Sequence, residues 1–190
     1  MPSGAAVRAR HMKSFVEAVQ GLEDERAEAI LGATRPGMLE TIEEATPSAW
    51  LPLELNVELT ELTSQRLAKE AFDFYRHMML AEYETSLFKS FIAMSIRMLG
   101  LAPSTYVKMT PRGWPLVFRR CGVFRALEQS KGRALLRVTE LPEICTRNEV
   151  WLESVRAGFA SAFDLTKTPG RVEWHELSLP LRRAVFVFQW

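Results

Sequence analysis

Residues 129–141, Gln-Ser-Lys-Gly-Arg-Ala-Leu-Leu-Arg-Val-Thr-Glu-Leu, decide the fold class of this chain of 190 residues. The polar link that contains Gly132 is typical of a hairpin turn. After it, Leu136, Val138 and Leu141 stand among Arg, Thr and Glu, as in a strand that buries one face. Residues 114–127, before the link, have the same strand-like character. The two segments therefore predict an antiparallel hairpin.

The pattern after this hairpin predicts one helix and two more strands. The helix should begin after Thr146, which stands three residues before Glu149 at the spacing of a capping box. Val172–Leu177 and Ala184–Trp190 have the composition of strands. Because short links between consecutive strands favour an antiparallel sheet, residues 111–190 are expected to form a β-β-α-β-β unit.

The N-terminal part is predicted to be helical. Apolar residues recur at helical spacing across residues 12–100 and favour about five helices. Ser48 is a candidate N-cap for a helix that runs through Trp50.

The stretch 64–99 is too long for one helix of a small domain. Thr85 or Ser86 is the expected division, and Gly100 the expected end. The second part, Leu87–Leu99, is apolar on most sides, which predicts a central, buried helix.

The expected architecture is therefore α+β. An N-terminal helical layer (12–100) is followed by a β-β-α-β-β antiparallel four-stranded sheet (111–190), in a single domain over residues 1–190. Apolar residues make up 47% and charged residues 25% of the chain. These fractions fit a packed core and exclude a mostly disordered or collagen-like protein.

The ends and the cysteines predict a cytoplasmic protein. No apolar segment follows the basic N-terminus as in a secretory signal, and no apolar run is long enough to span a membrane. Cys121 and Cys145 lack the spacing of a metal or redox motif, so both are expected to be reduced and partly buried.

Charge is balanced overall but uneven along the chain. Residues 17–84 hold 15 acidic and 5 basic side chains, whereas residues 100–140 hold 8 basic and 2 acidic ones. Attraction between the acidic helical layer and the basic sheet explains this uneven distribution of charge. The alternative explanation is a basic surface that binds an acidic partner. Arginines among aromatics in residues 112–137 could bind single-stranded nucleic acid, but alternation in a sheet produces the same pattern. Nucleic acid is therefore not an expected partner.

Few residues are candidates for chemistry. His77 stands four residues after Asp73, so this carboxylate could orient the imidazole, although a surface pair explains the spacing equally well. Glu82 and Glu84 do not converge on a helix and are expected on a solvated face. The other histidines are expected to be exposed: His11 and His175. No common nucleotide-binding, serine-hydrolase or zinc-protease motif occurs. The sequence thus predicts no catalytic residue, no metal site and no cofactor.

Methionines and aromatic residues at helical spacing suggest an adaptable apolar pocket, although core filling explains the same pattern. The pocket would lie between the Leu87–Leu99 helix, the helix that contains Trp151 and the sheet. Its candidate lining residues are Tyr75, Met79, Phe91, Met94, Met98, Trp151 and Phe159.

Landmarks in chain order carry a resemblance to known proteins. They are Thr46-Pro47-Ser48-Ala49-Trp50, Tyr83 and Ser86, Leu99-Gly100, Leu141-Pro142, Gly158 and the terminal Trp190. In this order they resemble a myxobacterial paralogous family of unknown function and of similar length. Its layout is similar to that of haem-nitric-oxide-binding, 4-vinyl reductase and TRAPP-type trafficking domains. The resemblance implies a helical layer on a four-stranded antiparallel sheet that sometimes encloses an apolar ligand. It carries over no catalytic residue, and the Tyr-x-Ser-x-Arg haem signature of the gas sensors does not occur.

The leading hypothesis is a non-catalytic binding or sensing module for an apolar small molecule. The alternative is a protein-interaction or scaffolding subunit, as a homodimer or in a complex with another protein, whose core fills itself. A third hypothesis is an enzyme that uses His77 or a cysteine.

Overall fold

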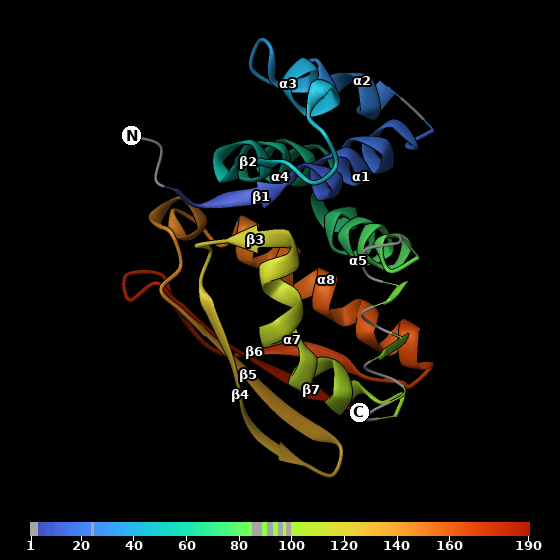
Figure 1. Ribbon diagram of the computed structural model, residues 1–190, viewed down its shortest axis with the longest axis vertical. Coiled ribbons are helices and arrows are strands. Elements are labelled where there is room, and N and C mark those ends of the chain that lie inside the picture. The colour runs from blue at the N-terminus through green and yellow to red at the C-terminus, as the bar shows by residue number, and fades with distance from the viewer. Residues whose placement is uncertain (1–3, 24, 85–88, 91–92, 95–96, 98–99) are drawn as a thin grey trace.

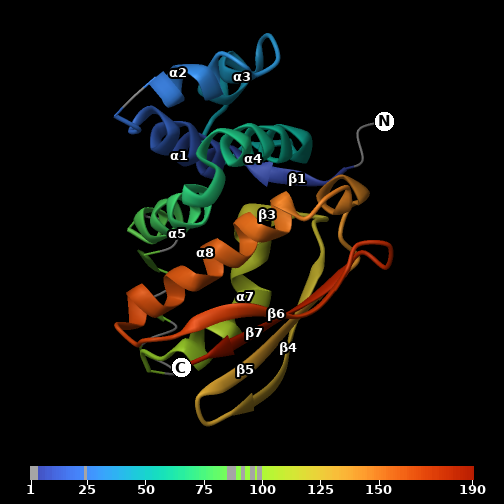
Figure 2. The ribbon, with the colours of Figure 1, turned by 180° about the vertical axis from the view of Figure 1, so that it is seen from behind.

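The computed structural model describes residues 4–23, 25–84, 89–90, 93–94, 97 and 100–190. N-terminal helices form one end of the molecule and a four-stranded sheet forms the other, with α5, α7 and α8 between them (Figures 1 and 2). The described α-helices are α1 (Ala9–Gln20), α2 (Glu25–Leu31), α3 (Met38–Glu44), α4 (Leu53–Leu67), α5 (Ala71–Glu82), α7 (Pro103–Val117) and α8 (Val150–Thr166). The predicted α+β class is confirmed.

The C-terminal sheet has the predicted β-β-α-β-β order. Its strands are β4 (Val123–Ser130), β5 (Arg133–Thr139), β6 (Arg171–Ser178) and β7 (Arg183–Gln189). They pair antiparallel in the order β4-β5-β7-β6, with α8 in the chain between β5 and β6. The hairpin turns at Gly132, whose φ of 77° is a conformation that glycine adopts without strain. One face presents Leu136 and Phe186, which are partners across β5 and β7 and are both fully buried.

A second, three-stranded sheet joins the two ends of the molecule and was not predicted. Its strands are β1 (Ala6–Arg8), β2 (Trp50–Pro52) and β3 (Phe118–Arg119), in the order β2-β1-β3. The prediction of a helix through Trp50 was wrong, because Trp50 pairs with Arg8 in this sheet and α4 begins only at Leu53. The Arg8 and Arg119 guanidinium groups lie 4.0 and 4.4 Å from the Trp50 ring centroid, which favours the strand through tertiary contacts.

The prediction of a strand over 114–127 was wrong in its first part, since α7 continues through Val117. Pro111 and Pro115 lie inside this helix, although proline lacks the N–H that an interior helical position normally donates. Packing outweighs that loss: Trp114 stacks on Phe118 with a ring-centroid distance of 4.3 Å, and its indole N–H donates to the Cys121 carbonyl at 2.8 Å.

Two helix boundaries also differ from the prediction. The long helical stretch breaks at a 3₁₀ turn, Ala68–Glu70, where Ala68 has a φ of 49°. The predicted division at Thr85 or Ser86 lies outside the described residues. Thr146 does not cap α8, because it ends a 3₁₀ turn and its hydroxyl donates to the Glu143 carbonyl.

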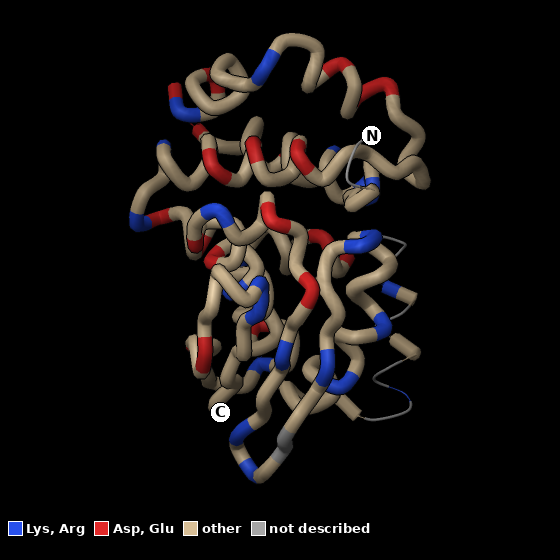
Figure 3. Tube along the Cα trace, turned by 90° about the vertical axis from the view of Figure 1, so that its left-hand side faces the viewer, with Lys and Arg blue, Asp and Glu red and all other residues tan. Residues whose placement is uncertain are grey.

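The charge asymmetry of the sequence appears in the structure. Lys and Arg positions follow the β4–β5 hairpin at the lower end of Figure 3, whereas Asp and Glu are frequent along the N-terminal helices. Among the residues that the structure describes, no helix has the length and apolar character needed to cross a bilayer.

Candidate ligand-binding cavity

A cavity of about 140 Å³ lies where α1, α4, α5, α7 and α8 meet. The described residues that line it include no Lys, Arg, Asp or Glu. Aromatic side chains in its wall include Tyr83, Tyr106, Trp114, Phe118, Trp151 and Phe159. A wall of this composition holds apolar molecules in preference to water.

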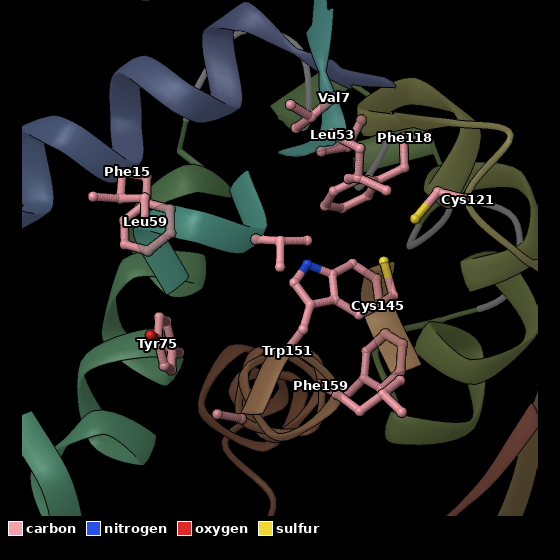
Figure 4. Packing of buried hydrophobic residues seen from close by; sticks show 14 of the residues in the cluster. Val7, Phe15, Leu53, Leu59, Tyr75, Phe118, Cys121, Cys145, Trp151 and Phe159 are labelled. Atoms are coloured by element: carbon pink, nitrogen blue, oxygen red, sulfur yellow. The ribbon is translucent and has the colours of Figure 1, made fainter. Parts of the chain in front are cut away.

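The apolar stripe of helix α8 forms one side of the cavity wall. Trp151, Val155 and Phe159 follow one another at four-residue spacing, so they share a face of the helix. The Trp151 indole N–H donates to the buried Asn56 Oδ1 at 2.8 Å, which fixes the ring against α4. Figure 4 shows Trp151 and Phe159 projecting from α8 on the side of Phe118.

Four of the predicted pocket residues line this cavity: Tyr75, Met79, Trp151 and Phe159. Met94 is 51% exposed and is not among the lining residues. Phe91 and Met98 lie outside the described residues. Binding by this set of side chains remains a prediction.

The tyrosines bring hydroxyl groups to the cavity without bringing charge. The Tyr83 hydroxyl donates to Tyr106 Oη at 2.7 Å, and Ser161 Oγ lies 3.0 Å from Tyr83 Oη. Burial raises the pKa of Tyr106 to about 12 and also raises the pKa of Tyr83. Both phenols therefore stay neutral at physiological pH.

His11 and Glu82 form a buried pair at the cavity that sequence analysis missed. Nδ1 of His11 lies 2.6 Å from Oε2 of Glu82, and the residues are only 6% and 2% exposed. The predictions of an exposed His11 and a solvated Glu82 were wrong, because α1 and α5 pack together and enclose both side chains. The only sequence signal is that His11 precedes the buried Phe15 by four residues, on the same helical face.

The residues proposed for chemistry lie elsewhere. His77 and Asp73 are both exposed on α5. Cys121 and Cys145 are free, fully buried and not among the residues that line the cavity. Burial, together with a hydrogen bond to Cys145, raises the pKa of the Cys121 thiol, so it is a poor nucleophile. Within the described ranges, no group of three His, Cys, Asp or Glu side chains could hold a metal ion.

Comparison with known proteins identifies the fold. No protein-family model and no curated protein matches the chain. A Cs H-NOX mutant that carries 4-cyano-L-phenylalanine aligns with a TM-score of 0.64 at 10% identity, over 96% of this chain and 95% of its own. This chain has the H-NOX fold.

Other H-NOX structures align over similar lengths. The Fe(II) unliganded H-NOX protein from K. algicida gives a TM-score of 0.62 at 12% identity, over 96% of this chain and 95% of its own. An oxygen-binding H-NOX domain related to soluble guanylate cyclases gives 0.59 at 10% identity, over 94% and 92%. The expected likeness to haem-nitric-oxide-binding domains is thus confirmed for the fold. At this identity it says nothing about individual site residues.

Proposed function

We propose that this protein is a non-catalytic binding or sensing module that takes up a small apolar molecule in the cavity between α5, α7 and α8. The observation that carries the proposal is the cavity of about 140 Å³ with aromatic walls and no charged lining residue in the described chain. Apolar cavities of roughly 150 Å³ stay dry and bind benzene or xenon. A molecule built on one six-membered ring therefore matches the space.

Haem is the obvious alternative ligand, because the H-NOX structures that align with this chain include an Fe(II) unliganded protein, one used to probe heme distortion and an oxygen complex. Haem needs an axial ligand to its iron and partners for its two carboxylates. The described wall offers one imidazole, that of His11, but no Lys or Arg, and its volume is below the roughly 300–1,000 Å³ of pockets for larger ligands. These residues do not fit haem, so we propose a module without this cofactor.

The test is a titration with benzene that follows two signals. Trp114 and Trp151 line the cavity, so ligand entry should change their fluorescence saturably, and binding to the native state should raise the thermal midpoint. Gly158→Leu should abolish both effects by filling the cavity. Ala81→Leu, which places a leucine side chain at an exposed position of α5, should retain them.

Two outcomes contradict the proposal. One is the absence of any saturable effect of benzene on the wild-type protein. The other is equal binding by wild type and a folded Gly158→Leu variant, which would place the ligand outside this cavity.

The remaining proposals rest on the sequence. We propose a cytoplasmic location and membership of the myxobacterial family. A homodimer or a complex with another protein stays a prediction, which sedimentation at micromolar concentration would test.

A further inference from the structure

Besides hydroxyl groups, the cavity wall presents an imidazole that is paired with a buried carboxylate, the His11–Glu82 pair. It joins α1 to α5 across 71 positions of the chain, and His11 contributes to the cavity wall. Neither side chain forms another hydrogen bond or ion pair with a described residue. Because Glu82 occupies Nδ1, Nε2 is the ring nitrogen that remains for a ligand.

The burial of the pair determines what Nε2 can do. A buried carboxylate is costly unless a cation neutralises it, and here the imidazole is the only candidate among the described partners. The pair has no net charge in two forms: imidazolium beside carboxylate, or neutral imidazole beside a protonated carboxyl. In the first form both ring nitrogens bear hydrogen. In the second, the carboxyl donates to Nδ1 and the hydrogen of the ring is on Nε2.

Nε2 is therefore a hydrogen-bond donor in both neutral forms of the pair. It becomes an acceptor only when a neutral imidazole lies beside a charged carboxylate, which leaves one uncompensated buried charge. A donor in an apolar cavity wall gains a hydrogen bond when a ligand offers it an acceptor. Purely apolar ligands cannot do so.

Resting on the proposed function, we infer that the preferred ligand is a single-ring molecule with a carbonyl oxygen, such as an aromatic aldehyde or ketone. The Nε2–H of His11 selects it by donating to that oxygen, and Glu82 is a positioning residue that keeps the hydrogen on Nε2. A site that donates a hydrogen bond discriminates strongly against analogues without the acceptor, because its buried polar group then stays unpaired.

Benzaldehyde and styrene provide the test, because they have the same shape and differ in a formyl against a vinyl group. Calorimetric titration of the wild-type protein should give about tenfold tighter binding of benzaldehyde, the effect of one buried hydrogen bond. The double variant His11→Phe/Glu82→Leu removes the pair without leaving a lone charge. It should bind both compounds equally.

His77→Phe is the matched control. It removes an exposed imidazole on α5 and keeps every lysine that could react with an aldehyde. This variant should retain the tenfold preference.

A second measurement needs no variant of the pair. A long-range ¹H–¹⁵N NMR correlation spectrum of the wild-type protein shows which ring nitrogens of His11 bear hydrogen. Nε2 should bear one before and after benzaldehyde is added. This measurement decides the case if the double variant does not fold.

The outcomes separate the two proposals. If neither compound binds, the proposed function is wrong and this inference falls with it. If both bind equally to the wild type, or if Nε2 carries no hydrogen, the inference alone is overturned and an apolar binding module remains.

Discussion

Gly158→Ala should stabilise the protein, because this glycine lies in the middle of α8 and faces the cavity. A Cβ at this position would lie 3.8 and 3.9 Å from Met79 Cγ and Cβ, which is ordinary van der Waals contact. Alanine is favoured over glycine inside a helix by about 1 kcal/mol, and burying one methyl group adds up to about 0.8 kcal/mol. The expected gain is therefore about 1.5 kcal/mol in the free energy of unfolding, or roughly 3–6 °C in Tm for a chain of this length.

Urea denaturation followed by far-UV circular dichroism measures this change, with the m-value expected to stay constant. Gly170→Ala is the matched control, because there a Cβ would lie 2.6 Å from the Gln189 carbonyl oxygen and also meet the Phe163 ring. It should destabilise the protein by about 1–3 kcal/mol, the usual cost of overpacking. A loss of stability in Gly158→Ala would contradict this prediction, because it would mean that α8 and α5 leave no space beside Met79.

Three further predictions concern other groups. Burial raises the pKa of all three tyrosines, so above about pH 10 the unfolded chain loses protons that the native state keeps. The free energy of unfolding should therefore fall by up to about 4 kcal/mol per pH unit. Tyrosinate absorbance that rises while the circular dichroism stays native would contradict this prediction. Asn56→Ala leaves the Trp151 indole N–H unpaired and creates a small cavity, so urea denaturation should show a loss of about 2–4 kcal/mol in the free energy of unfolding. A loss below about 0.5 kcal/mol would argue against a stabilising role for that hydrogen bond. Arg76 donates two hydrogen bonds of 2.6 Å to Asp164, but both side chains are about one-third exposed. A double-mutant cycle with alanines should therefore give a coupling energy of about 1 kcal/mol, and less in high salt. No coupling would mean that solvent screens the pair.

Local patterns in the sequence were enough to predict the sheet and one wall of the cavity. Alternation of apolar and polar residues around Leu136 and Val138 identified β5. β7 was identified by its composition, a run of apolar residues at 184–188 that are all buried. Helical spacing placed Trp151 and Phe159 on one side of α8, and both line the cavity.

The failures concern features that depend on distant parts of the chain. β1 and β2 are three residues long and exist because they pair with each other across about forty positions, a signal that local periodicity does not contain. α7 retains two prolines that would normally end a helix, because Trp114 packs against Phe118. His11 and Glu82 each resemble surface residues of an amphipathic helix, and only their contact explains why both are buried.

A crystal structure under xenon pressure would show whether the cavity admits an apolar guest, because xenon enters apolar cavities and needs no specific contact. One well-occupied xenon atom is expected between α5, α7 and α8, within contact of Trp151 and Phe159, in the wild-type crystal and not in Gly158→Leu. Continuous protein density in that space without bound xenon would contradict the proposed binding cavity, since the core would then fill itself and no ligand could enter.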